Sequence, residues 1–174
     1  AAAYPKFVGG LSFSGDWKGI DLSFLFQAGL GRDVALTGVY SGGIMDNTQM
    51  TKPFYHGGNS PKYLVENSWR EDNTNAEFPR LSIVQASSNN AYSSTFWYRS
   101  GDYLRLKNLQ IGYTFPQKWM SRIGIDRLRI YFEGQNLWTV SELTKFNIDP
   151  EQPGVSNGYY PQQRIFSFGV NLAF

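Results

Sequence analysis

The clearest pattern in the chain is the alternation of apolar and polar residues over its last segment. From Phe166 to Phe174, every even position is large and apolar, and every odd position is small or polar. Such alternation is typical of a β-strand with one apolar face. Its length also matches the roughly 9 to 11 residues of a tilted strand that crosses a membrane. We therefore predict a strand over residues 164–174.

Four earlier segments show the same period of two. Residues 7–17 and 20–30 alternate on either side of Asp16-Trp17-Lys18-Gly19, a sequence that predicts a hairpin turn. Residues 126–138 alternate as well, and their polar side carries charged residues. Together with residues 101–115, these segments predict five strands.

The segment 101–115 departs from strict alternation at one point. Leu104 and Leu106 occupy even positions, whereas Leu109 and Ile111 occupy odd ones. A β-bulge inserts one extra residue into a strand and absorbs such a shift. We predict a bulge near Lys107-Asn108.

The connections between the predicted strands alternate between short and long. The links at 16–19 and 116–125 are short, whereas those at about 31–95 and 139–162 are long. Outer-membrane barrels have short periplasmic turns and longer extracellular loops. The fold class that follows is all-β, a transmembrane antiparallel β-barrel. Its aromatic residues should form two girdles, with Trp17, Tyr113, Phe115 and Phe174 at the inner interface and Tyr103 and Trp138 at the outer one.

Five strands are too few to close such a barrel, because bacterial single-chain barrels use even numbers from eight upward. An open sheet edge in lipid would also leave backbone groups without hydrogen bonds. We therefore expect residues 1–174 to be part of a longer polypeptide.

Composition narrows the possible partners and chemistry. Aromatic residues make up 17% of the chain and charged residues only 17%, below the roughly 25% of an average soluble domain. The net charge of +2 comes without a basic stripe, which argues against a nucleic-acid partner. The lack of cysteine excludes disulfides, cysteine zinc sites and thiol nucleophiles.

An ordered set of short motifs resembles the C-terminal region of the SusC/RagA family of TonB-dependent outer-membrane transporters. The motifs are Pro5-Lys6-Phe7-Val8-Gly9-Gly10-Leu11-Ser12-Phe13, Asp21-Leu22-Ser23-Phe24-Leu25-Phe26-Gln27, Gly31-Arg32-Asp33, Trp69, Pro79-Arg80-Leu81, Gly101-Asp102-Tyr103-Leu104-Arg105-Leu106-Lys107-Asn108-Leu109, Gly112-Tyr113, Gly134-Gln135-Asn136-Leu137-Trp138 and Tyr160-Pro161.

This resemblance implies that the chain supplies the last five strands of a 22-stranded barrel, a size used by transporters with a plugged lumen. It also implies a plug and a TonB box that lie outside this sequence, and a SusD-like surface lipoprotein that closes the barrel. The expected localisation is the bacterial outer membrane, in contact with its lipids. The expected function is TonB-dependent import of a bulky nutrient, an oligosaccharide or a peptide.

Aromatic residues in and beside the long 31–95 connection are the candidates for cargo binding, because their rings can stack on sugar rings or peptide side chains. The alternative for each is packing of the loop against itself and the lid. The candidates are Tyr40, Tyr55, Trp69, Trp97 and Tyr98.

Two further features concern the strands. Arg127, Arg129, Glu133 and Gln135 share one strand face and are predicted to face the lumen, where they would line the channel or brace the plug. Phe174 resembles the aromatic ending that the barrel-assembly machinery recognises, and the alternative is a simple apolar strand end.

Little in the sequence suggests chemistry or a cofactor. The run 71–75 offers oxygen ligands for calcium but lacks the glycine and terminal glutamate of an EF-hand, which favours a solvated turn. His56 has no second histidine or cysteine to complete a metal site or a catalytic triad. We therefore expect no catalytic residues and no metal. The alternative function is a soluble β-sandwich that binds carbohydrate, because alternation does not show whether the apolar face meets lipid or a second sheet.

Overall fold

The structure is a computed structural model, and it describes residues 3–36, 61–81, 94–153 and 162–174. The chain divides into two compact units. The first, here called the sheet unit, contains residues 6–30, 103–140 and 162–174. The second, the loop unit, contains residues 1–5, 31–102 and 141–161.

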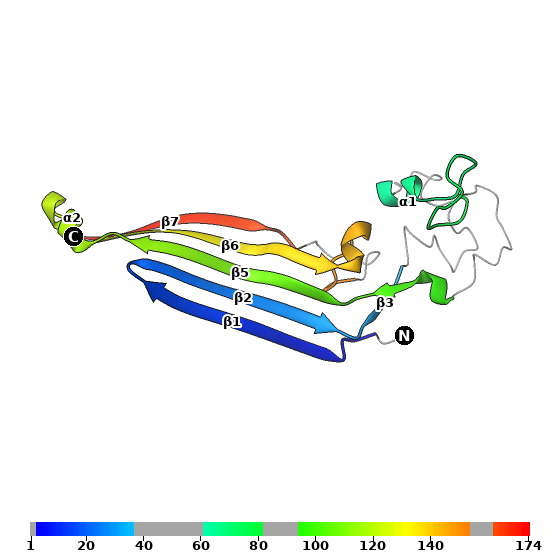
Figure 1. Cartoon of the computed structure of the whole chain (residues 1–174), viewed down its shortest axis with the longest axis horizontal. Coiled ribbons are helices and arrows are strands. Elements are labelled where there is room, and N and C mark those ends of the chain that lie inside the picture. The colour runs from blue at the N-terminus through cyan, green and yellow to red at the C-terminus, as the bar shows by residue number, and fades with distance from the viewer. Residues whose placement is uncertain (1–2, 37–60, 82–93, 154–161) are drawn as a thin grey trace. The chain divides into compact units, whose positions relative to one another are not determined.

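The sheet unit is one five-stranded sheet (Figure 1), and it confirms the five predicted strands. β1 pairs antiparallel with β2, β2 with β5, and β6 with β7. The order across the sheet is β1-β2-β5-β6-β7. The bounds are β1 Phe7–Trp17, β2 Ile20–Leu30, β5 Tyr103–Thr114, β6 Arg127–Ser141 and β7 Ile165–Ala173.

The strand register places apolar residues opposite one another on a single face. Phe13 pairs with Phe24, and their rings stack with centroids 5.3 Å apart. At the other side of the sheet Phe132 pairs with Phe168, with ring centroids 5.2 Å apart. These cross-strand pairs stabilise the sheet, yet most of the face remains open, and Phe168 is 83% exposed.

The predicted bulge is confirmed at the expected position. Leu25 on β2 pairs with Asn108 on β5, but the next residue, Phe26, pairs with Leu106. Lys107 is therefore the extra residue. Without it, every residue of β5 before the bulge would change sides, because a shift of one position exchanges the two faces of a strand.

Two short connections close the same end of the sheet unit. Lys18 and Gly19 join β1 to β2 with φ angles of 48° and 86°, as a two-residue type I′ hairpin turn requires. The other link contains α2 (Gln117–Met120) and the 3₁₀ turn η3 (Ser121–Ile123). The backbone N–H of Thr114 donates to the carbonyl of Gly19 at 2.7 Å, so the two connections lie side by side.

Three aromatic residues predicted for the inner girdle, Trp17, Tyr113 and Phe115, lie at this end of the sheet, whereas the placement of Tyr103 in an outer girdle is wrong. Trp17 and Tyr113 both lie beside Ile20 in the register, and the Tyr113 and Phe115 rings are 4.9 Å apart. Tyr103, in contrast, lies on the polar face, where it is buried and accepts a hydrogen bond from Gln27 at 3.1 Å. It faces this way because the bulge moves the apolar positions to even numbers.

The loop unit contains short elements from both of the long predicted connections. These are β3 (Asp33–Ala35), α1 (Lys62–Glu66), η2 (Thr95–Trp97), β4 (Tyr98–Ser100) and η4 (Glu142–Phe146). β3 and β4 pair antiparallel. None of the helical segments in the described residues has the length and apolar character that a membrane crossing requires.

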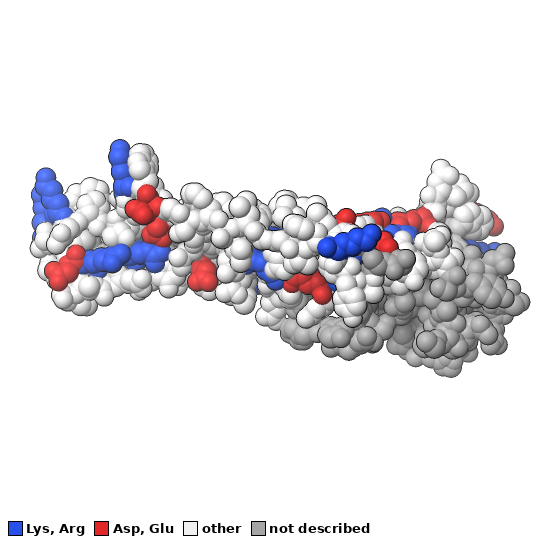
Figure 2. Space-filling model, turned by 90° about the horizontal axis from the view of Figure 1, so that it is seen from below, with Lys and Arg blue, Asp and Glu red and all other residues white. Residues whose placement is uncertain are grey.

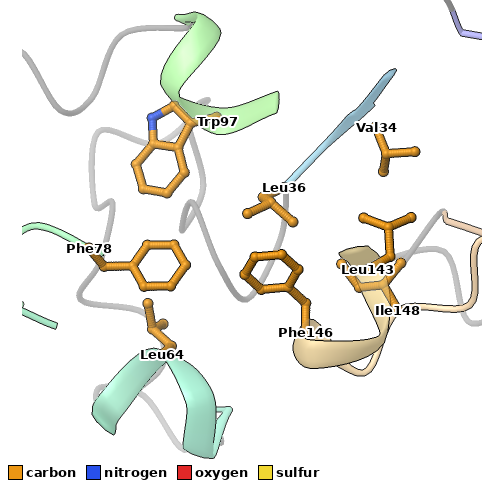
Figure 3. Packing of buried hydrophobic residues seen from close by; sticks show 8 residues of the cluster. All are labelled: Val34, Leu36, Leu64, Phe78, Trp97, Leu143, Phe146 and Ile148. Atoms are coloured by element: carbon orange, nitrogen blue, oxygen red, sulfur yellow. The ribbon is translucent and has the colours of Figure 1, made fainter. Parts of the chain in front are cut away.

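A separate hydrophobic core holds the loop unit together (Figure 3). Phe78 and Trp97 stack at its centre, and Leu64 of α1 and Phe146 of η4 are fully or almost fully buried beside them. The cluster is Val34, Leu36, Leu64, Phe78, Trp97, Leu143, Phe146 and Ile148. Segments far apart in the sequence thus form one packed body.

Candidate functional site

An ion pair that spans three strands lies on the polar face of the sheet. The guanidinium of Arg129 on β6 donates to both carboxylate oxygens of Asp21 on β2, at 2.9 and 2.5 Å. β5 runs between these strands, and its residue opposite Asp21 is Gly112. A Cβ at this position would lie 2.5 Å from the carboxylate and 2.6 Å from Arg129, so only glycine leaves room for the pair.

A second polar group lies at the opposite end of the same face. Arg105, only 4% exposed, donates to the hydroxyl of Thr139 at 2.9 Å and to the side-chain oxygen of Gln162 at 2.6 Å. Lys107, the bulge residue, donates to the same oxygen of Gln162 at 3.4 Å. These bonds join β5, β6 and the residues before β7. In Figure 2, acidic and basic side chains lie close together in a band beside broad uncharged areas.

The structure brings the four predicted lumen residues to one face, because all occupy odd positions of β6. Arg129 is held by Asp21, and its guanidinium also lies 4.7 Å from the centre of the Tyr131 ring. Gln135 donates to Glu133 at 3.3 Å, and Arg127 is exposed. The roles of Asp21, Arg105 and Gly112 could not be predicted from the sequence, because they depend on pairing between distant strands.

The five aromatic candidates have different positions. Trp69 and Tyr98 are each 37% exposed, whereas Trp97 is 2% exposed and packs in the core of the loop unit. For Trp97 the structure therefore supports the packing alternative. Tyr40 and Tyr55 lie outside the described residues, as does His56.

Trp69 borders a hollow of about 480 Å³ in the loop unit. Two arginines and a glutamate share this hollow with apolar side chains, so it offers an aromatic ring beside both signs of charge. The lining residues are Val65, Ser68, Trp69, Arg70, Glu71, Arg80 and Leu81.

The run considered for calcium forms a tight turn. Arg70 and Asn73 exchange backbone hydrogen bonds of 3.3 and 2.9 Å, and the Arg70 guanidinium lies 3.2 Å from the Asp72 carboxylate. No cluster of three or more metal-ligating side chains occurs in the described part of the chain.

Glu77 is the centre of a charged cluster that joins the segments of the loop unit. Its carboxylate accepts hydrogen bonds from Tyr63 at 2.7 Å, from Arg99 at 3.0 Å and from Lys145 at 3.3 Å. Arg99 also lies 3.8 Å from Glu142. The cluster therefore links α1, the segment before Phe78, β4 and η4.

This arrangement shifts two pKa values. The hydrogen bond to Glu77, together with burial and the carboxylate charge, raises the pKa of Tyr63 to about 12. For Glu77, burial alone would raise the pKa, but the donors Tyr63, Arg99 and Lys145 outweigh it and hold the pKa below its usual value. At neutral pH, Glu77 is thus ionised, and its neighbours stabilise the carboxylate.

Comparisons with known proteins agree with the sequence motifs. No protein-family model matches the chain. The TonB-dependent receptor P3 of Formosa agariphila is 28% identical over 98% of this chain. The TonB-dependent receptor SusC of Bacteroides thetaiotaomicron is 30% identical over 59% of it. The RagAB peptide importer in its closed-closed state covers 99% of the chain at 28% identity, with a TM-score of 0.66. This chain is similar to a segment of the SusC/RagA-type TonB-dependent transporters.

The SusC/RagA-like chain spans only part of these proteins, namely 16% of receptor P3, 10% of SusC and 18% of the RagAB chain. Their barrels confirm the predicted fold class, so the five-stranded sheet is a segment of a transmembrane antiparallel β-barrel.

The ion pair over Gly112 gives a first prediction. In the full-length SusC/RagA-like protein, Gly112→Ala should destabilise the barrel by about 1–3 kcal/mol, because the new methyl group displaces Asp21 or Arg129. The readout is the temperature at which the folded band on a gel converts to the unfolded band. Gly10→Ala is the control, because its Cβ would meet its nearest neighbour at 3.4 Å. Equal effects at the two positions would contradict the proposed crowding.

The Glu77 cluster gives a second prediction. Because the pKa of Glu77 is lowered in the folded state, its contribution to stability is present above the unfolded pKa near 4.5 and is lost as the pH falls through the folded value. Glu77→Gln should therefore weaken the loop unit at pH 7, and its difference from wild type should shrink below about pH 4.5.

Hydrogen exchange at the backbone amides of Leu36 and Phe78, corrected for the intrinsic effect of pH, measures this difference. Glu66→Gln is the control, because Glu66 pairs with Lys62 at 3.6 Å on an exposed surface, where such pairs contribute little. A Glu77→Gln defect of the same size at both pH values would contradict an electrostatic role.

Proposed function

We propose that the full-length protein imports a bulky nutrient, an oligosaccharide or a peptide, across the bacterial outer membrane. It would act with a SusD-like surface lipoprotein and would be driven by TonB. The relatives named above are TonB-dependent receptors, and RagAB is a peptide importer. The similarity of this chain to a segment of these proteins supports the proposal.

The observation that carries the proposal is the contrast between the two faces of the sheet. One face presents large apolar side chains to the outside, and the other holds ion pairs and hydrogen bonds. The exposed apolar residues include Phe7, Leu11, Phe13, Trp17, Ile20, Ile111, Ile130, Phe166, Phe168, Val170 and Leu172. Soluble proteins rarely leave so large a continuous apolar area in water, whereas a transmembrane strand places it against lipid.

The soluble sandwich is the less favoured alternative. A sandwich would cover the apolar face with a second sheet of similar size. In the described residues, the other sheet consists of β3 and β4, which have three residues each. Two such strands cannot cover five strands of 9 to 15 residues.

The polar face fits the wall of an aqueous channel. It carries the Asp21–Arg129 ion pair and the hydrogen-bonded side chains of Arg105 and Lys107, and a wide barrel has a polar interior of this kind. The loop unit would be extracellular and would offer Trp69 and Tyr98 to cargo, because aromatic rings stack on sugar rings and on peptide side chains. No covalent chemistry is needed, and we infer that the protein is not an enzyme.

Uptake measurements test the energy source. Cells that express the full-length protein and its lipoprotein should take up labelled cargo only when TonB is present, since import against a gradient needs coupled energy. A strain without TonB should keep surface binding of the cargo but lose accumulation. Wild-type accumulation in that strain would rule out the proposed mechanism.

The hollow at Trp69 gives a second test. Trp69→Ala should weaken cargo binding to the complete complex by up to about tenfold, because stacking by one aromatic ring contributes about 0.5–1.5 kcal/mol. Trp69→Phe keeps an aromatic ring and should retain most of the affinity. Binding by calorimetry with purified complex measures both variants, and unchanged affinity of Trp69→Ala would remove Trp69 from the binding site.

A further inference from the structure

The link between β5 and β6 exposes large apolar side chains. Trp119 is 55% exposed and Ile123 is 65% exposed, and they lie four residues apart across α2 and η3. Met120 between them is buried and anchors the link, and its carbonyl accepts a hydrogen bond from the N–H of Ile125 at 3.1 Å. The link is therefore held in place while two large apolar side chains point outward.

Basic residues flank both apolar side chains. Lys118 and Arg122, also four residues apart, are exposed, and no hydrogen bond or ion pair holds them among the described residues. In the adjacent hairpin turn, the Lys18 ammonium lies 4.6 Å from the centre of the Trp17 ring, which is 68% exposed. Each connection thus presents a cation beside an exposed tryptophan.

Trp17 of the hairpin lies at the end of the apolar face of the sheet, where it pairs with Ile20. Ile20, the residue after the hairpin turn, pairs in the register with Tyr113 near the end of β5, and Ile20 is exposed. The carboxylates at this end are Asp16, Asp21 and Asp126; Asp21 is bound by Arg129, and the other two are exposed. Asp16 occupies an even position of β1 and so belongs to the polar face. Lys18 lies beside the Trp17 ring, and Lys118 and Arg122 directly precede Trp119 and Ile123 in the sequence.

We propose that this end of the sheet binds the phosphate headgroups of anionic phospholipids. Lys18, Lys118 and Arg122 hold the phosphates, while Trp119 and Ile123 enter the boundary between headgroups and acyl chains. Amphipathic segments with Lys or Arg beside Trp and aliphatic residues bind membrane surfaces in this way. The proposal rests on the proposed function, because it requires the sheet to lie in a membrane.

Native mass spectrometry of the full-length protein, purified from membranes in mild detergent, tests the proposal. The probes are phosphatidylglycerol and phosphatidylcholine at equal concentration, with lipid A in a parallel arm. The wild type should retain phosphatidylglycerol at least fivefold better than phosphatidylcholine, because each basic residue near a membrane surface favours anionic lipid by roughly that factor.

Two variants that each remove three positive charges distinguish binding at this site from a general effect of net charge. K18Q/K118Q/R122Q should lower the preference to about one, and K62Q/R70Q/R80Q in the loop unit should leave it unchanged. The charge-preserving variant W119S/I123S should lower retention of both phospholipids by a similar factor of about five.

An unchanged preference in K18Q/K118Q/R122Q would overturn the proposal, and so would a wild type without preference. Stronger retention of lipid A than of phosphatidylglycerol through the same three residues would overturn the phospholipid assignment. Recovery of the wild-type protein in the aqueous fraction, without membranes, would instead contradict the proposed function.

Discussion

The alternation of side chains along a strand is the constraint on which this structure depends. Each strand offers every second residue to one side, and five strands here place their large apolar residues on the same side. Within the described residues, no protein layer of matching size covers that side. Hydrocarbon is the solvent that makes such a face favourable, and it also requires backbone groups to be paired inside the sheet. The bulge at Lys107 belongs to this constraint, because it keeps both halves of β5 in phase with β2.

On the polar face, large side chains have to pack against the neighbouring strands of the sheet. Glycines in neighbouring strands make room for them. Gly112 lies beneath the Asp21–Arg129 pair, and a Cβ at Gly29 or Gly169 would collide with the ring of Tyr103 or Tyr131, respectively. Each ring thus covers the backbone of the next strand. The rings of Tyr103 and Tyr131 and the Asp21–Arg129 pair therefore lie close against the backbone of the sheet.

Features that follow from the local alternation of residues could be predicted from the sequence, whereas features that depend on contacts between distant residues could not. The five strands, the hairpin at Lys18 and the bulge follow from neighbouring residues, and all are found. The core of the loop unit joins Leu64 to Phe146, residues in separate connections with no periodic pattern. For the same reason, the sequence could not distinguish buried Trp97 from exposed Trp69.

The loop unit's packed core has a consequence for the proposed import cycle. Hydrophobic packing and the Glu77 cluster hold the described residues around Trp69, so cargo binding there, as proposed, would need little further ordering of these residues. Preorganisation of this kind favours capture at low cargo concentration, but it also opposes release, because the unit gains little freedom when cargo leaves. Under the proposed function, the energy for release would come from outside the loop unit, and coupling to TonB would supply it.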